Sequence, residues 1–357
     1  MNHDLLPSFL FKPYGEIGVE EEFYLVDKKN FSPIEDPKEF FKTLPKKLEN
    51  NLGVELFDFV IETWVNKSKT IKETKKEIKQ KRKLLKQHAK KFDYKIIGAG
   101  LHPNMNWRIY EHSKKQDYKR QLKRIQFPQK RNTTAGLHIH VGMGDRQKAL
   151  WIANEIRRYL PLFLALSANS PFWQERDTGL QSARALIFEN LPNTGIPSFH
   201  KNINEYVGYI QQLLNNNLIE KPREIWWDVR INNKYGTLEV RAPDSQNKIT
   251  KTYSLLKLIY GTIDYLNKQY DRGKENTRLK QERLIQNKWQ ALRYGKKADF
   301  VLENQKITVK DLLEKLIQKT GLTDKDIEPI KGETGANLQR KTYKNDGMHH
   351  LLESLVI

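Results

Sequence analysis

The chain has 357 residues, of which 63 are Lys or Arg and 43 are Asp or Glu, so its formal net charge at pH 7 is +20. It contains no cysteine, which excludes disulfides, thiolate metal sites and a cysteine nucleophile. No apolar run approaches the ~18 residues of a membrane span, and the N-terminal segment lacks the basic and apolar regions of a secretory signal. We therefore expect a cytoplasmic protein without a membrane partner.

The first predicted element is a strand in the segment GEIGVEEEFYLVD, residues 15–27. Its apolar residues share one face, while Glu20 and Glu22 project together from the other. Two carboxylates about 4–6 Å apart repel each other by a few kcal/mol. A divalent cation compensates such a pair inside a cavity, whereas a solvated pair needs no partner. Glu21 falls on the apolar face, where the sequence indicates no partner for it, and the simplest interpretation is a position at a strand edge.

A second strand is predicted over Val54–Trp64, whose alternation places Glu62 among mostly apolar neighbours. The segment Asn66–Lys91 then carries eleven Lys and one Arg but only two Glu, with a thin apolar stripe. This pattern predicts a surface helix with a basic outer face. A second basic stretch, Lys114–Arg131, also reads as exposed.

The two basic segments have two interpretations. They could bind a polyanion such as a nucleic acid, or they could be solvated surface. Few aromatic residues are interleaved with the basic ones, and single-stranded nucleic-acid binding surfaces usually contain such stacking platforms. The sequence therefore favours solvated surface, and a nucleic-acid partner is disfavoured.

The clearest alternation follows a predicted strand at Tyr94–Ala99 and lies in TAGLHIHVGM, residues 134–143. His138 and His140 project from the face opposite its apolar residues. One histidine there would be an ordinary core residue, but two on one face of a strand are unusual. The sequence next predicts one long amphipathic helix at Arg146–Ser167.

The loop Asn190–Ser198 contains two prolines and one glycine, which predicts an ordered loop that carries binding groups. After a predicted helix at Asn202–Leu218, Ile225–Ile231 places Trp226, Asp228 and Arg230 on one face. The next strand, Tyr235–Ala242, places Thr237, Glu239 and Arg241 on one face, and the two strands are predicted to form a hairpin. Four further helices are predicted at Lys248–Lys268, Asn276–Tyr294, Val309–Thr320 and Gly347–Ile357.

These elements predict a single α+β domain, residues 1–357, built on an antiparallel sheet. The polar faces of its strands would gather carboxylates, imidazoles and guanidinium groups in one cavity. Such oxygen-rich sites with one or two imidazoles suit Mg²⁺ or Mn²⁺, and arginines beside them suit phosphate or carboxylate groups. The combination suggests nucleotide-dependent phosphoryl chemistry. The residues that we expect in the cavity are Glu20, Glu22, Glu62, His138, His140, Arg230, Glu239 and Arg241.

Six segments carry a resemblance to a known family: GVEEEFYLVD, GLHPN, GLHIHVGM, LPNTGIP, WWDVR with YGTLEVRAPD, and NKWQALRYG. In this order the set resembles the family-2 glutamate–cysteine ligases, also called carboxylate–amine ligases. The resemblance covers about Tyr14 to Arg340. It implies a glutamine-synthetase-like catalytic fold, in which helices pack over an antiparallel sheet funnel.

The resemblance also implies a reaction. ATP would phosphorylate the γ-carboxylate of glutamate, and the amine of cysteine would then attack the γ-glutamyl phosphate. The products would be γ-glutamylcysteine, a precursor in glutathione biosynthesis, together with ADP and phosphate.

The matched motifs imply roles for the site residues. Glu20 and Glu22 would be ligands of two different Mg²⁺ ions, with Glu62 as a further ligand. Glu239 would share a metal with Glu20 and His138. His140 would lie near the ATP phosphates, and Arg241 would stabilise the transferred phosphoryl group. Arg230 would either share that role or hold the α-carboxylate of the substrate. The loop Asn193–Gly195 would close over the amino-acid site or form only an ordered turn.

Two departures from the family pattern leave the substrate open. Ile231–Asn233 stands where a proline-containing turn is expected, and the segment RAPDSQ ends differently from the usual form. The same ligase chemistry with another amine or acid is therefore an alternative. A polyanion-binding protein that uses residues 66–91, and a metal-dependent phosphohydrolase, are rivals from other classes. The oligomeric state, including a homodimer, stays open.

Overall fold

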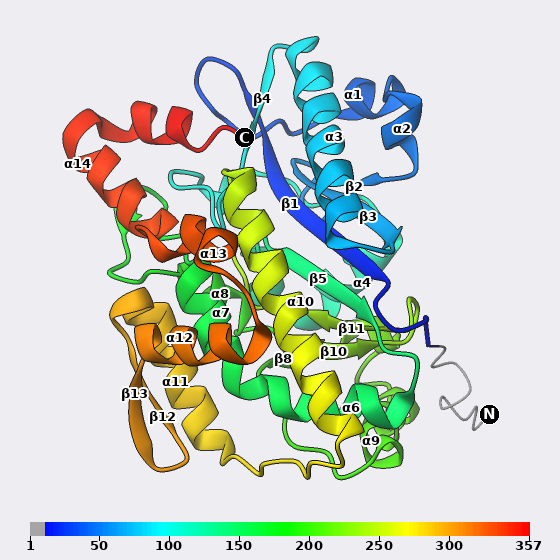
Figure 1. Ribbon diagram of the computed structural model, residues 1–357. Coiled ribbons are helices and arrows are strands. Elements are labelled where there is room, and N and C mark those ends of the chain that lie inside the picture. Colours follow the sequence, from blue (N-terminus) through cyan, green and yellow to red (C-terminus); the bar gives the residue numbers. More distant parts are fainter. Residues whose placement is uncertain (1–10) are drawn as a thin grey trace.

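The computed structural model describes residues 11–357, and one antiparallel sheet of seven strands lies at its centre (Figure 1). The strand order is β10–β11–β5–β1–β3–β2, and β4 pairs with the end of β1. This arrangement confirms the expected α+β class. The first ten residues, for which no signal segment is expected, lie outside the described residues. The strands are β1 (Ile17–Asp27), β2 (Leu52–Val54), β3 (Val60–Ser68), β4 (Tyr94–Ile97), β5 (Leu137–Gly142), β10 (Val229–Asn232) and β11 (Thr237–Val240).

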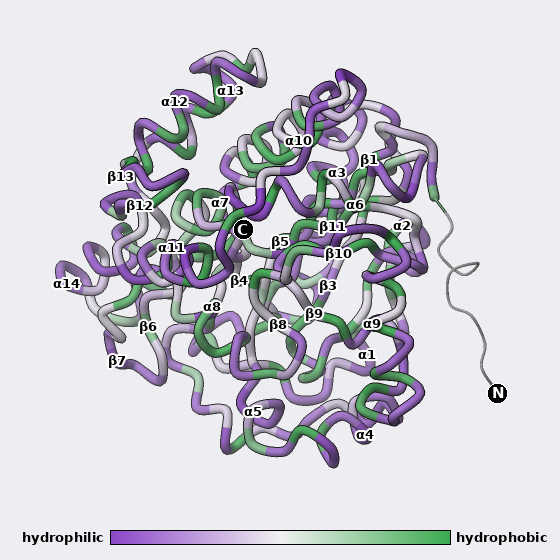
Figure 2. The backbone as a smooth tube through the Cα atoms, turned by 90° about the horizontal axis from the view of Figure 1, so that it is seen from below, coloured by the Kyte–Doolittle hydropathy of each residue, from purple (hydrophilic) through white to green (hydrophobic). Residues whose placement is uncertain are grey.

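Helices cover the apolar face of the sheet. Figure 1 shows α10 (Ile249–Asp271) crossing in front of the strands, with α3 (Ile71–Lys90) beside it and α6 (Arg146–Ile156) below. Ile17 and Val19 of β1 are buried in this core. Seen from below, α4 (Gln116–Ile125) and α5 (Phe127–Lys130) lie on the side of the sheet opposite α10 (Figure 2).

The remaining elements surround this sheet. The predicted helix at Val309–Thr320 is present with the same bounds. The C-terminal helix begins earlier than the predicted start at Gly347, and it bends at that glycine. The hairpin β12–β13 and the helix α13 are additional elements. The further bounds are α1 (Lys38–Lys42), α2 (Lys46–Glu49), α7 (Leu160–Ser167), α8 (Ala183–Phe188), α9 (Ile203–Asn215), α11 (Gln281–Tyr294), α12 (Val309–Thr320), α13 (Asp324–Lys331), α14 (Gly335–Ser354), β6 (Phe172–Trp173), β7 (Arg176–Asp177), β8 (Thr194–Gly195), β9 (Trp226–Trp227), β12 (Asp299–Leu302) and β13 (Gln305–Thr308).

The strand β1 has two halves with different surroundings. In the second half both faces are buried: Phe23 and Leu25 pack in one core cluster, and Tyr24 and Val26 pack in another. The Tyr24 hydroxyl also donates a hydrogen bond to the carbonyl of Thr133 at 2.5 Å. The polar face is therefore confined to the first half of β1.

Glu21 does not lie at a strand edge, because it stands in the middle of β1, so that expectation is wrong. It is buried in a central strand and accepts two hydrogen bonds from Arg82 of α3, at 2.6 and 3.1 Å. Arg82 also donates to the backbone carbonyls of Gln246 and Asn247, at 2.8 and 2.6 Å. One basic residue of α3 thus serves as the buried counterion of β1.

Arg82→Met should destabilise the fold strongly. Removing one partner of a buried ion pair leaves an uncompensated charge, which costs about 3–5 kcal/mol. Denaturant unfolding should show this loss, while Lys83→Met, at an exposed position of the same helix, should stay within about 0.5 kcal/mol of the parent protein. Equal unfolding midpoints for the two variants would contradict a structural role for this pair.

Three predicted elements are interrupted. Val54–Trp64 is not one strand, because residues 55–59 form a turn between β2 and β3. Arg146–Ser167 is α6, a short 3₁₀ segment and α7, and Pro161 stands at the start of the fully buried α7. Ile225–Ile231 is broken at Asp228 between β9 and β10. The predicted hairpin of β10 with β11 is confirmed.

Across residues 11–357, none of the helices combines the length and the apolar character needed to cross a membrane.

Candidate active site

The strand register brings the predicted residues together. Glu20 of β1 lies opposite His138 of β5, and Glu22 lies opposite Glu62 of β3. Glu239 of β11 lies between two partners, opposite His140 of β5 and opposite Arg230 of β10. Directly opposed residues point to the same face of a sheet, so these side chains form one polar surface.

A cavity of about 530 Å³ lies over this surface. Six of the eight predicted residues line it; Glu239 lies beneath the surface and is fully buried. The other walls come from the turn after β2, from α4, from α8 and from β9. The predicted residues that line the cavity are Glu20, Glu22, Glu62, His138, Arg230 and Arg241.

His140 faces a second, smaller pocket of about 170 Å³. Glu20 and Tyr235 line both pockets, so the two meet at the first half of β1. Gly18 lies opposite His140, and a Cβ at Gly18 would stand 3.3 Å from that of His140. The small pocket therefore depends on the absence of a side chain there. The pocket is also lined by Lys12 and Lys67 and by Ile17, Val19 and Val65, whose side chains are buried in the core on the other face of the sheet.

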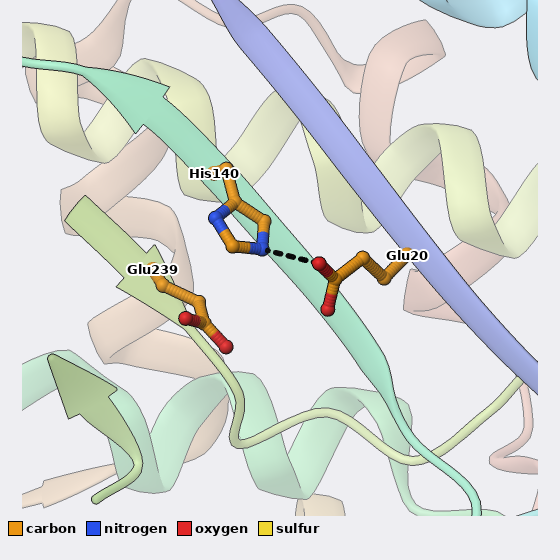
Figure 3. Close-up of side chains that lie close together, drawn as sticks. All are labelled: Glu20, His140 and Glu239. Carbon is orange, nitrogen blue, oxygen red and sulfur yellow. Dashed lines mark ion pairs between the residues drawn. The ribbon is translucent and has the colours of Figure 1, made fainter. Parts of the chain in front are cut away.

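Three overlapping groups of side chains could hold metal ions. In each group one ligand atom from every member lies within 4.8 Å of the others. Figure 3 shows Glu20, His140 and Glu239 converging from β1, β5 and β11. Glu239 is thus grouped with His140, whereas the family resemblance implied a metal shared with His138. The three groups are Glu20, His140 and Glu239; Glu20, Glu62 and His138; and Glu22, Glu55 and Glu62.

The carboxylates differ sharply in their electrostatics. Burial alone would raise the pKa of Glu20, but His140 and His138 hold it well below its usual range. Burial, together with Glu20, Glu55 and Glu22, raises the pKa of Glu62 well above its usual range. Without a cation Glu62 is thus driven towards its neutral form, and a bound cation would favour its ionised form.

Each imidazole keeps one nitrogen directed at a carboxylate. His138 Nδ1 lies 3.0 Å from Glu20 Oε2, and His138 Nε2 is buried 3.7 Å from Glu22 Oε1, without a hydrogen-bond partner among residues 11–357. His140 Nδ1 lies 2.9 Å from the Thr237 hydroxyl, which leaves Nε2 towards Glu20 Oε1 at 3.2 Å. Buried imidazole nitrogens among clustered carboxylates are donors that fit a divalent cation.

Glu239 is held from three sides. Arg230 donates to both of its carboxylate oxygens, at 2.7 and 3.1 Å, and Arg241 donates to Oε1. The Asn232 amide donates to Oε2 at 2.7 Å. Despite burial, the two arginines and His140 lower the pKa of Glu239. The Asn that departs from the family pattern therefore contacts a site carboxylate.

Sequence reasoning missed several cavity residues. Glu55 lies in the turn after β2, and the Tyr118 hydroxyl of α4 donates to it at 3.0 Å. Arg184 of α8 donates to the carbonyls of Ala242 and Arg241 only at 3.3 and 3.4 Å, and in the described chain its Nε is buried without a hydrogen-bond partner. Tyr118 belongs to the basic stretch that was expected to be exposed, and that expectation is wrong for its cavity face.

The loop 190–198 is ordered, as expected. Its strand β8 pairs in parallel with β9, and Leu191 and Trp226 line the cavity on either side. Gly195 has a positive φ of 84°, and a Cβ there would lie 2.8 Å from Glu189 Oε1. Glycine therefore permits both the backbone turn and this close approach.

Comparison with known proteins identifies the family. Residues 16–338 match the family described as glutamate-cysteine ligase family 2 (GCS2). The chain is 39% identical to a glutamate–cysteine ligase of Haloferax volcanii, an alignment that covers 97% of this chain and 98% of that protein. It is 38% identical to one of Natronomonas pharaonis, covering 99% of this chain and 98% of that protein.

Two solved structures share the fold. The glutamate–cysteine ligase of Francisella tularensis in complex with AMP has a TM-score of 0.73 at 11% identity, over 97% of this chain and 88% of that one. A bifunctional glutathione synthetase from Pasteurella multocida has a TM-score of 0.67 at 14% identity, over 99% of this chain and 52% of that one. The motif order, the sheet and these matches agree, and the chain belongs to glutamate–cysteine ligase family 2.

Proposed function

We propose that this protein is an ATP- and Mg²⁺-dependent ligase that joins the γ-carboxylate of glutamate to the amine of cysteine. One observation carries the proposal: three overlapping carboxylate and imidazole groups lie where a large polar cavity meets a small, mostly apolar pocket. Family membership supplies the reaction type, and the relatives named above are glutamate–cysteine ligases. We place the reaction in the cytoplasm, where ATP is available and cysteine stays reduced.

The donor set fits Mg²⁺ or Mn²⁺. Glu20 belongs to two of the three groups and Glu62 to two, so these two carboxylates would bridge neighbouring ions. Bound cations would neutralise the triphosphate and polarise its terminal phosphoryl group. His138 and His140 would complete two of the groups, and the raised pKa of Glu62 supports the need for positive charge there.

We assign the small pocket to ATP and the large cavity to the two amino-acid substrates. The small pocket has a mostly apolar lining for a flat base, two lysines for phosphates, and His140 beside the shared carboxylate Glu20. This arrangement supports the expected position of His140 near the ATP phosphates. The large cavity has the volume and the charged walls for two amino acids.

We assign a different role to each of three arginines near the cavity. Arg241 contacts Glu239 and lies 3.4 Å from His138, so we assign it to the transferred phosphoryl group. Arg230 is engaged on both oxygens of Glu239 and on the carbonyls of Arg223 and Ile225, so we assign it to positioning Glu239. In the described chain the Arg184 side chain makes only long hydrogen bonds and an ion pair of 3.8 Å with Asp244, and we assign it to a substrate α-carboxylate.

The proposed reaction has two balanced steps. The γ-carboxylate oxygen of glutamate attacks the γ-phosphorus of ATP, and ADP leaves with the bonding electron pair. The amine then attacks the acyl carbon, phosphate leaves, and the amine releases one proton. Positioning and charge neutralisation provide most of the catalysis in such phosphoryl transfers.

The test is ADP release by the purified protein with ATP and Mg²⁺, first with glutamate alone, then with cysteine, and then with a panel of other amines. We expect turnover that needs both glutamate and cysteine, with γ-glutamylcysteine as the product. Turnover with a different amine or acid would keep the ligase and replace the substrate. ATP turnover without any acceptor amine would indicate a phosphohydrolase and overturn the proposal.

A further inference from the structure

A buried lysine outside the cavity joins two parts of its wall. Lys288 of α11 lies in the motif NKWQALRYG, for which the proposed reaction has no role. Its side chain is 6% exposed, and its Nζ lies 2.6 Å from Asp228 Oδ2 and 3.4 Å from Glu189 Oε1. Burial opposes its charge, but the two carboxylates raise the pKa of Lys288, so it is a cation.

The two carboxylates belong to segments that are far apart in the sequence. Glu189 follows α8 and begins the loop that contributes Leu191 to the cavity. Asp228 stands between β9, which contributes Trp226, and β10. Lys288 therefore connects both sides of this wall from behind. Among residues 11–357, neither Glu189 nor Asp228 forms an ion pair with any other cation.

Backbone hydrogen bonds connect Asp228 to residues of the candidate active site. The Asp228 carbonyl accepts a hydrogen bond from the backbone N–H of Arg241 at 2.8 Å, and the Asp228 N–H donates to Gly195 at 2.9 Å. The Trp226 N–H donates to Asn193 at 2.8 Å. A shift of Asp228 would thus displace the residue that we assign to the phosphoryl group and the loop beside the amino-acid cavity.

A purely structural role for this lysine is the alternative. Replacing a whole buried ion pair by well-packed apolar residues of the same volume is often neutral for stability, so the stability of the fold does not by itself require this cluster of charges. A charged clamp differs because it fixes the direction of two carboxylates at once. The geometry at Lys288 is of this second kind.

We propose that Lys288 is a positioning residue, which acts through Asp228 and Glu189 to hold the wall of the amino-acid cavity and the backbone of Arg241. The inference rests on the proposed function for its catalytic readout. Neither wall segment, 189–195 or 226–228, lines the small pocket. The clamp should therefore affect the amino-acid substrates far more than ATP.

The test compares Lys288→Met with Lys251→Met. Lys251 is an equally buried lysine of α10, 6% exposed, whose Nζ donates to the Glu333 carbonyl away from both pockets. For Lys288→Met we expect the KM for glutamate to rise at least tenfold and kcat to fall, while the KM for ATP changes less than twofold. Lys251→Met should lose thermal stability but keep both KM values. Lys288→Arg, which retains the charge, should recover part of the loss.

Hydrogen exchange provides a readout that is independent of turnover. Peptides that cover 189–195 and 226–241 should exchange faster in Lys288→Met and not in Lys251→Met. Unchanged exchange there, or a lowered stability with an unchanged KM for glutamate, would overturn the clamp. If Lys288→Met does not fold, Asp228→Asn decides, because it should raise the same KM at least threefold. If the parent protein shows no ligase activity, the proposed function fails, and exchange alone decides the clamp.

Discussion

Glu20→Ala is expected to abolish metal-dependent ATP turnover while the protein stays folded. Glu20 belongs to two of the three potential metal groups and lines both pockets. Its loss would therefore disturb both the proposed nucleotide pocket and the proposed amino-acid cavity. We expect kcat/KM to fall at least about 10³-fold, which corresponds to about 4 kcal/mol of transition-state stabilisation. The measurement is the initial rate of ADP release over a range of ATP and Mg²⁺ concentrations, which gives kcat/KM for ATP.

The fold should tolerate this change. Glu20 lies on the polar face of β1, so alanine removes a ligand and no core volume. His138 and His140 lose a charged neighbour, but both sit on the cavity side of the sheet, where water can replace it. Glu282→Gln, at an exposed carboxylate of α11, is the matched control and should keep full activity. Near-normal turnover in Glu20→Ala would refute the metal assignment.

The strands that carry the site could be predicted because both of their faces are specified in the sequence. Alternation placed Glu20 with Glu22 and His138 with His140, and the register then aligned these pairs across neighbouring strands. Glu239 is the instructive case. Alternation found its face, but only the register shows that it stands opposite His140.

Other site residues carry no periodic signal. Glu55 lies in a turn that the alternation of Val54–Trp64 obscured, and its role depends on the fold bringing it to Glu62. Arg184 projects from a six-residue helix, and Tyr118 belongs to a stretch whose charge suggested open surface. Arg82 shows the same limit, because its partner Glu21 is 61 residues away in the sequence. Contacts between distant segments are set by packing, which a one-dimensional pattern does not contain.

The many basic residues of α3 suggest a wholly exposed surface, but some of them are buried. Lys81 and Arg82 of α3 are buried, and Arg82 neutralises a carboxylate of the central strand. Part of the positive charge that suggested a polyanion surface therefore stabilises the sheet that carries the site. The outward lysines of α3 are exposed, and the sequence-based interpretation that they form a solvated face without a polyanion partner stays a prediction.

Arg241→Lys is expected to be nearly as severe as the loss of Glu20, although it keeps the charge. The guanidinium contacts Glu239 and His138 and is mostly buried, with its Nε free of a hydrogen-bond partner within the described residues. That geometry leaves donors for a phosphoryl group, and a lysine ammonium cannot reproduce the planar, two-point contact. Burial lowers its pKa less than Glu239 and Glu22 raise it, so Arg241 remains charged throughout the working pH range.

The kinetic pattern separates catalysis from binding. If Arg241 stabilises charge that develops during phosphoryl transfer, Arg241→Lys should lower kcat at least about 10²-fold and leave the KM for ATP within a few-fold. Arg223→Lys is the control, because Arg223 also lines the cavity but pairs with Asp117 at the surface. An unchanged kcat together with unchanged KM values in Arg241→Lys would remove this arginine from the mechanism. A raised KM for glutamate with unchanged kcat would instead assign Arg241 to the substrate carboxylate, and Arg230 would then be the remaining guanidinium on Glu239 for the phosphoryl group.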